Sequence, residues 1–168
     1  MIPSFFRIFL LIASLFAAGS CRISLSSTGV SSDARSARVS FFLPTAPLAK
    51  PTVGQTFTES LKDILSSQGK LDMVNSGGDL VYEGSVSGYA TAPVAIQGND
   101  QAALNRLTIT VSLKFTNTKN EKKSFETSFS RYADFSSSQS LSAVEDQLIK
   151  DITDQLVQDV FNRTMQDW

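Results

Sequence analysis

Few side chains in this chain of 168 residues are able to carry out covalent or acid–base chemistry. It has a single cysteine, Cys21, and no histidine. Without an imidazole to act as the base, hydrolysis by a Ser–His or Cys–His pair is excluded. A zinc site would have to be built from carboxylates alone, which zinc sites in proteins hardly ever are. We therefore expect no metal and no cofactor, and the position of the lone thiol becomes the main clue.

A pairing of serine with lysine is the one nucleophilic arrangement that these residue types leave open. No Ser-x-x-Lys sequence occurs where a predicted strand turns into a helix, which is the context such a nucleophile needs. The serines are instead spread over predicted turns and the polar faces of strands. The sequence therefore favours a protein that is not an enzyme.

Residues 1–20, which precede Cys21, have the order of a secretory signal peptide. One positive charge, Arg7, is followed by a short apolar stretch from Ile8 to Ala18, and two small residues close the segment. This order is typical of a cleaved signal. A helix that spans a bilayer would need about 20 consecutive apolar residues, and this stretch ends earlier. We expect residues 1–20 to be removed.

Cys21 completes the sequence Ala18-Gly19-Ser20-Cys21, which resembles the lipobox of bacterial lipoproteins. In that motif the cysteine thiol receives a diacylglycerol and becomes the first residue of the mature protein. Acyl chains contribute about 0.8 kcal/mol for each buried methylene, so two or three chains on one residue hold a protein firmly. The resemblance predicts lipid attachment at Cys21. The alternative is a soluble exported protein with a free thiol, which would be a liability in an oxidising compartment.

The remaining chain has the length of one domain. Residues 21–38 are rich in serine and show little apolar periodicity, which is typical of a flexible tether. We expect a single folded domain over residues 39–168. After cleavage the chain has two more acidic than basic residues, which argues against a dedicated nucleic-acid partner.

The clearest structural signal is a strand over residues 107–115, where apolar and polar residues alternate strictly. Residues 124–135 return after a polar turn and predict the second arm of a hairpin. Further strands are expected over Val39–Leu43, residues 71–74 and Leu80–Tyr89, where glycines indicate a close backbone approach.

Two helices are predicted, one between the strands at Val39–Leu43 and residues 71–74 and one after the last strand. One begins near Thr52 and stops at Gly69, and the second follows Ser142 to the end of the chain. Thr52 with Gln55, and Ser142 with Glu145, have the spacing of capping boxes. Each helix has one apolar stripe, and Asp151, Asp154 and Asp159 fall mostly off the second stripe and are expected to be solvated. The first stripe consists of Phe57, Leu61, Ile64 and Leu65, and the second of Val144, Leu148, Ile149, Ile152, Leu156, Val157, Val160 and Phe161.

These elements predict an α+β fold in two layers. We expect a mixed or antiparallel four-stranded sheet with two long helices packed on one face. Basic residues are concentrated in residues 106–131, and Arg106 and Lys114 share the polar face of the strongest strand. That face is a candidate contact for the phosphates of an anionic glycolipid. The alternative is that these charges only solvate a hairpin and its tip.

Five segments of the domain match a known family in order and content. They are PTVGQTFTESLKD at 51–63, GDLVYEGSVSGY at 78–89, APVAIQGNDQAALNRLTITVSLKF at 92–115, FETSFSRYADF at 125–135 and LIKDITDQLVQDVFNRTMQDW at 148–168. Through these segments, none of which is a catalytic signature, residues 39–168 resemble the LPS-assembly lipoprotein (LptE) family of Gram-negative bacteria. The resemblance implies an outer-membrane lipoprotein on the periplasmic side that plugs an LptD-like β-barrel translocon or aids its folding, and that contacts lipopolysaccharide.

Residues 90–104 form a long segment without a predicted element between two predicted strands, and long loops in compact domains are often functional. The apolar residues APVAI in this segment would suit insertion into a barrel lumen, although an ordinary crossover packed on its own sheet is the alternative. A second class of function also stays open, namely a generic lipoprotein that acts as a binding module without a translocon. The resemblance favours the first class.

Overall fold

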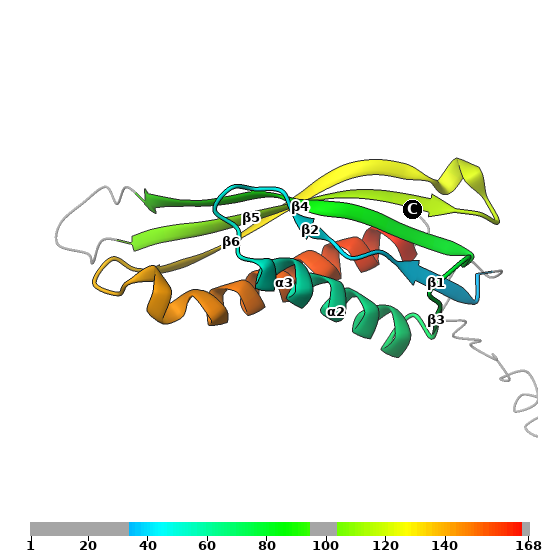
Figure 1. Ribbon diagram of the computed structural model, residues 1–168, viewed down its shortest axis with the longest axis horizontal. Helices are drawn as coiled ribbons and strands as arrows, with labels where there is room; N and C mark the ends of the chain where they lie inside the picture. Colours follow the sequence, from blue (N-terminus) through cyan, green and yellow to red (C-terminus); the bar gives the residue numbers. More distant parts are fainter. Residues whose placement is uncertain (1–33, 95–103, 166–168) are drawn as a thin grey trace, which may run out of the picture.

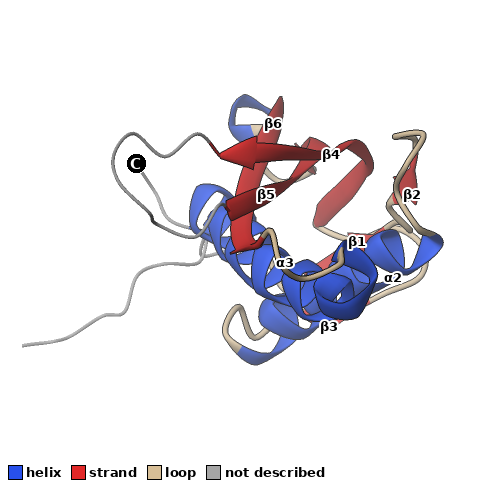
Figure 2. Ribbon diagram, turned by 90° about the vertical axis from the view of Figure 1, so that its left-hand side faces the viewer, coloured by secondary structure: helices blue, strands red, loops and turns tan. Residues whose placement is uncertain are grey.

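The computed structural model describes residues 34–94 and 104–165. A sheet forms one layer, and two helices, α2 (Pro51–Ser67) and α3 (Leu141–Met165), pack on one face of it (Figures 1 and 2). The predicted α+β fold with two helices on one face is confirmed. None of the helices in the described ranges is both long enough and apolar enough to cross a membrane.

The sheet has six strands in place of the predicted four. Two short strands, Ser36–Val39 and Leu43–Pro44, replace the one predicted over residues 39–43, and the short strand predicted over residues 71–74 also pairs into the sheet. Strands β4 and β5 form a long antiparallel hairpin, and β6 pairs antiparallel with β5. Strands β1 and β2 pair in parallel with β4, and β3 pairs in parallel with β1. The order is β3-β1-β4-β5-β6, with β2 on β4. The strands are β1 (Ser36–Val39), β2 (Leu43–Pro44), β3 (Asp72–Met73), β4 (Leu80–Val94), β5 (Leu104–Asn117) and β6 (Phe125–Ser136), with the 3-10 helix η1 (Glu121–Lys123) between the last two.

The first strands begin earlier and break sooner than the sequence pattern predicts. Strand β1 starts at Ser36, inside the range assigned to the tether, and it ends at Val39. The chain then bends, and Leu43 resumes pairing with β4 as β2. Pro44 ends β2 because it has no backbone N–H to continue a ladder. The rest of the predicted tether and the signal segment lie outside the described residues.

The core lies between the sheet and the helices. All five apolar residues of the alternating strand face it and are at most 2% exposed: Leu107, Ile109, Val111, Leu113 and Phe115. The predicted stripes of both helices meet this surface, with Val144 and Phe161 only partly buried at its margin. Gly84 confirms the predicted close approach, since a Cβ there would lie 2.0 Å from the backbone oxygen of Ser112. The apolar periodicities therefore identified the core face of each long element.

Neither predicted capping box forms. Pro51 opens α2 after Lys50, and Thr52 lies within the first turn. Proline suits this position because its fixed φ matches the helix and its missing N–H would have no partner there. In α3, Ser142 is also inside the helix, and Glu145 is buried and turned towards other elements. Both helices have the residue spacing of a capping box, but in each of them the predicted capping residue lies inside the helix and so cannot cap it.

The predicted loop over residues 90–104 is mostly strand at its two ends. Strand β4 continues to Val94, which pairs with Leu104 at the start of β5, so the connection is a hairpin and no crossover. Pro93 is tolerated inside β4 because β1 and β2 pair with this strand only up to Val86, which leaves the opposite edge without a ladder. Residues 95–103 lie outside the described residues.

Two buried threonines in the helices predict opposite effects on stability. Thr58 donates a hydrogen bond to the Gly54 carbonyl (2.7 Å) and accepts one from the N–H of Phe42 (3.0 Å). The Thr153 hydroxyl, by contrast, has no hydrogen-bond partner among the described residues although the residue is 1% exposed. We expect Thr153→Val to raise the free energy of unfolding by about 1 kcal/mol and Thr58→Val to lower it by about 1 to 2 kcal/mol. Urea titration of both variants measures the two signs, and equal shifts would contradict the assignment.

Candidate functional site

The face of the sheet that the helices leave uncovered is the candidate interaction surface (Figure 2). We call it the open face and define it by the polar residues of β5 with their neighbours on β4 and β6. Its centre is a set of hydroxyl side chains that lie in register across the three strands. Its members are Ser85 and Ser87 on β4, Thr108, Thr110 and Ser112 on β5, and Ser128 and Ser130 on β6.

Several of these hydroxyls bond to one another. Ser112 donates to Ser87 at 2.8 Å and lies 3.1 Å from the Ser128 hydroxyl. Thr110 lies 3.0 Å from Ser130. Hydroxyl groups can donate and accept, so the same groups can exchange these bonds for bonds to a polar ligand. The predicted polar face of β5 is confirmed, and the side chains on it are small and form hydrogen bonds.

Arg106 is on the open face but is already paired. Its guanidinium donates to both carboxylate oxygens of Asp134, at 2.7 and 2.9 Å. It also lies 3.6 Å from the centre of the ring of Tyr132. The hydrogen bond with Arg106 lowers the pKa of Asp134, and the same bond raises the pKa of Arg106. The pair and the half-exposed ring form one stacked group at this end of the sheet.

Lys114 is at the opposite end of β5 from Arg106. It lies in register between Glu83 and Glu126, and it forms no ion pair within the described ranges. Glu83 is instead bound to Arg38 at 2.8 Å. Eight residues of strand separate Lys114 from Arg106, a distance of roughly 27 Å. The structure therefore places the two predicted contact residues on one face but does not bring them together.

An apolar rim borders the open face along β2. Phe41 is 50% exposed, Leu43 62% and Leu48 74%. Leu43 is in register with Ser85, so its side chain is on the same face as the hydroxyls. Phe42, which lies between Phe41 and Leu43 in the sequence, turns inward and packs edge-on against Phe57 with ring centres 4.8 Å apart. Sequence reasoning missed this rim because it treated residues 39–43 as one strand and assigned no face to its residues, although Phe41, Phe42 and Leu43 must alternate in direction along such a strand.

A buried polar cluster joins the starts of both helices to the sheet. The Glu145 carboxylate accepts a hydrogen bond from the Tyr89 hydroxyl (2.5 Å) and forms an ion pair with Lys50. Burial alone would raise the pKa of Glu145, but the hydrogen bonds from Lys50 and Tyr89 outweigh it and lower the pKa. Burial also raises the pKa of Tyr89. The cluster fixes one end of the domain.

The lowered pKa of Glu145 predicts a loss of stability in acid. A carboxyl whose pKa is lower in the folded state stabilises the protein above its unfolded value of 4.5, and this contribution disappears as the pH falls through the folded value. We therefore expect the free energy of unfolding to fall less between neutral and acidic pH in Glu145→Gln than in the wild type. Urea titrations at both pH values measure this difference. An identical fall in the two proteins would contradict the role of Glu145.

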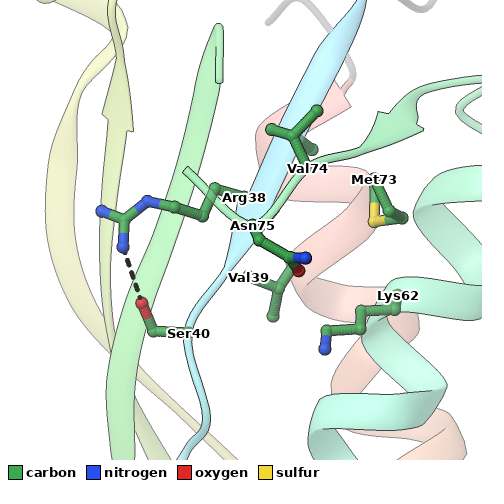
Figure 3. A pocket seen from close by; sticks show the side chains of 8 residues that line it. Arg38, Val39, Ser40, Lys62, Met73, Val74 and Asn75 are labelled. Atoms are coloured by element: carbon green, nitrogen blue, oxygen red, sulfur yellow. Dashed lines mark hydrogen bonds between the residues drawn. The ribbon is translucent and has the colours of Figure 1, made fainter. Parts of the chain in front are cut away.

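A small pocket lies between β1 and α2 (Figure 3). It measures about 160 Å³ and is lined by Val39, Lys62, Met73 and Asn75 among others. Arg38 borders it, but its guanidinium points away and bonds to Ser40 and Glu83. Sites for small molecules usually measure about 300 to 1,000 Å³. This pocket is therefore too small for a lipid.

The described residues show no group of histidine, cysteine or carboxylate side chains arranged to hold a metal ion. Of the predicted basic segment, Arg131 faces the helices and donates to both carboxylate oxygens of Asp159, at 2.6 and 2.7 Å. Asp159 is therefore paired and not solvated as predicted. Lys119, Lys122 and Lys123 lie at the tip of the β5–β6 hairpin, away from Arg106. The basic residues of this segment are therefore dispersed over both faces of the sheet and the hairpin tip.

Comparison with known proteins identifies one matching family and several solved structures with a similar fold. The model of a family described as LptE, lipopolysaccharide-assembly, matches residues 34–164. No curated protein matches the chain. A minor lipoprotein from Acinetobacter baumannii has a similar structure, with 15% identity, 77% of this chain and 91% of that chain covered, and a TM-score of 0.53. A hypothetical protein from Chlamydia trachomatis has 10% identity, coverage of 79% and 96%, and a TM-score of 0.52. At these identities the structures show a likeness of fold.

Proposed function

The chain belongs to the LptE lipopolysaccharide-assembly family, and from that premise we propose that it is an outer-membrane lipoprotein that supports an LptD-like β-barrel. The observation that carries this proposal is the family match over residues 34–164, which includes every described element from β1 to the last turn of α3. In this proposal the domain works by contact with the barrel and with lipopolysaccharide, without chemistry of its own.

Three features of the surface support a role as a binding partner. The apolar rim offers Phe41, Leu43 and Leu48 for burial against another protein. Beyond Val86, the edge of β4 that lies opposite β5 pairs with no strand among residues 34–94 and 104–165. This edge carries the small exposed residues Ala90 and Ala92, which permit close approach by another backbone. We propose that the rim and this edge contact the barrel.

Depletion of the protein in its own cells tests the proposed function. We expect newly made lipopolysaccharide to stop reaching the cell surface, because the barrel would lose the partner that assembles or supports it. Surface labelling of lipopolysaccharide after depletion measures this effect. Unchanged delivery to the surface, with the protein shown to be absent, would reject the proposal.

Lys114 and Arg106 are the proposed contacts for lipopolysaccharide phosphates on the open face. Lys114 is better placed to act, since its ammonium group is not engaged by a carboxylate in the described ranges, whereas Arg106 would have to share Asp134. We expect Arg106→Ala with Lys114→Ala to weaken lipopolysaccharide binding by at least roughly tenfold, because the loss of the Lys114 contact alone removes a hydrogen bond to a charged group, which contributes about 1.5 to 3 kcal/mol.

The matched control removes two basic residues of the helix layer, Lys62 and Lys150, and so changes the net charge equally. Binding of fluorescent lipopolysaccharide to both double variants separates a local contact from a general charge effect. If the variant of the open face binds as tightly as the control, these two residues are not the contacts.

A further inference from the structure

Strand β6 is the last strand of the sheet, and its outer edge pairs with no strand among the described residues. Its pairing with β5 runs from Phe125 to Ser136 without a bulge. The strand contains neither proline nor glycine. Prolines, bulges and covering elements are the usual means by which proteins keep an edge strand from pairing with another chain. The edge of β6 is therefore regular and able to accept a further strand.

The register of the sheet determines which backbone groups of β6 point outwards. The carbonyl of Tyr82 on β4 accepts the N–H of Ser40 at 2.9 Å, so the backbone of Tyr82 faces away from β5. Along a strand inside an antiparallel sheet, successive residues bond alternately to its two neighbours. Phe115, opposite Tyr82, therefore bonds to its partner Phe125 on β6. Every second residue after Phe125 does the same, and the residues between them direct N–H and C=O groups outwards. The outward residues are Glu126, Ser128, Ser130, Tyr132 and Asp134.

Both faces of β6 are accessible along this edge. The five outward residues have their side chains on the open face, and all five are exposed. On the helix side, Thr127 and Arg131 are exposed and Phe129 is only partly buried. Arg131 is the one charged residue of β6 on that side, and its charge is paired with Asp159 of α3. An added strand would therefore pair the outward backbone groups and cover more of Phe129.

The side chains along β6 make this edge complementary to a second copy of itself. Two antiparallel copies must set outward residues opposite outward residues, since a slip of one residue turns every side chain to the wrong face. When the twofold axis passes through Phe129, Ser128 lies opposite Ser130 of the second copy. Glu126 then lies opposite Tyr132, whose hydroxyl is able to donate to the carboxylate. The two Phe129 rings form an aromatic pair across the strands, which stabilises such a ladder.

Other registers are less favourable. An axis through Ser130 would set Glu126 against Asp134 of the second copy, and an axis through Arg131 would set two guanidinium groups against each other. Like charges directly opposite each other destabilise a pair of strands. An axis through Tyr132 avoids like charges but sets Phe129 against Phe135, which is already buried in its own core. The axis through Phe129 is thus the register that buries new apolar surface without opposing like charges.

We propose that two copies of this chain pair through the outer edge of β6, antiparallel and with the twofold axis through Phe129. The axis is perpendicular to the sheet, so the two sheets join into one and the two open faces form one continuous surface. The apolar rim and the free edge of β4 lie on the other side of each sheet and remain accessible. The pairing needs neither an acyl chain nor a barrel, so it stands apart from the proposed function.

Single cysteines test the register in the mature chain from residue 21 with Cys21→Ser. Opposite Cα atoms of a pair that is not hydrogen-bonded lie about 4.5 Å apart, which a disulfide is able to bridge. We therefore expect Phe129→Cys to form a covalent dimer on mild oxidation. Thr127→Cys alone should not, because its two copies would lie about 13 Å apart, and Arg131→Cys alone should not either. A mixture of these last two variants should cross-link. Both positions are exposed, so the mixture tests the register even if Phe129→Cys unfolds.

Sedimentation of the same chain without added cysteines measures the dimer itself. Ser128→Lys with Ser130→Lys sets ammonium groups opposite each other twice and should weaken dimerisation about tenfold. The matched control, Ser85→Lys with Ser87→Lys, adds the same charge to the open face on β4 and should change dimerisation less than about twofold. Ser128→Glu with Ser130→Glu should also weaken it. An equimolar mixture of the lysine and glutamate variants of β6 should restore the dimer, because opposite charges then face each other.

A chain that sediments as a monomer up to its highest soluble concentration would overturn the proposal. That result is also the one expected if another segment of the same chain, or a different protein, occupies the edge of β6. Cross-linking of Thr127→Cys alone, or equal weakening by the lysine variants of β6 and β4, would overturn it too. So would a failure to cross-link in both Phe129→Cys and the mixture. Unfolding midpoints of the variants, measured in the same buffer, show that the fold is intact.

Discussion

Loss of the thiol at Cys21 is expected to move the protein from the membrane fraction to the soluble fraction. The comparison is between the native chain and a Cys21→Ser chain that is exported by an ordinary secretory signal in place of residues 1–20. Because each buried methylene contributes about 0.8 kcal/mol, two or three acyl chains hold a protein firmly, whereas charge alone holds it weakly.

Fractionation at high salt and the intact mass of each chain measure this effect. The high salt weakens any electrostatic contact between the domain and the membrane surface. The control exports wild-type residues 21–168 with the native signal and Ser20→Ala, which keeps a small residue before the cysteine. We expect this control to stay acylated and sedimentable. A native chain whose mass shows an unmodified Cys21 would contradict the proposed anchor.

Truncation of Phe57 is expected to lower the free energy of unfolding by about 4 kcal/mol. Phe57 is buried in α2, and its ring meets that of Phe42, which is fully buried behind the apolar rim. Alanine at this position leaves a cavity that a helix pinned by Gly54 against the Phe42 carbonyl is poorly able to close. Such a loss is large against the total stability of a single domain.

The adjacent rim supplies the matched control for Phe57→Ala. Phe41 has the same side chain but is half exposed, so Phe41→Ala should change stability by less than about 1 kcal/mol. Urea unfolding of both variants in the Cys21→Ser background gives the two free energies. Similar losses for the two phenylalanines would mean that the rim is part of the core and not a surface for a partner.

The core could be predicted from the sequence because it depends on local periodicity. Alternation over residues 107–115 identified the buried face of β5, and the helical stripes identified the faces of α2 and α3. The short strands β2 and β3 could not be predicted with their boundaries, since two-residue pairings depend on what lies beside them. The extension of β4 past Tyr89 likewise depends on its partner β5.

The surface was harder to predict because its charges are paired over long separations. Arg106 meets Asp134 only because β5 and β6 adopt one particular register. Glu145 has the spacing of a capping residue, yet Tyr89 and Lys50, distant in the sequence, bind it. Of the two residues predicted from the polar face of β5, Lys114 keeps an unengaged charge and Arg106 does not. The sequence pattern therefore predicted which residues share the polar face of β5, whereas the tertiary structure determines which of their charges are paired.

Purification of the native protein through a C-terminal tag in mild detergent tests the central claim most directly. If the chain supports an LptD-like barrel, a large outer-membrane protein should purify with it in stoichiometric amount and change its electrophoretic mobility on heating. Phe41→Ala with Leu43→Ala should reduce the amount recovered while the fold stays intact. Recovery of the acylated protein alone, with no barrel from membranes that contain one, would contradict the account and favour a binding module that acts without a translocon.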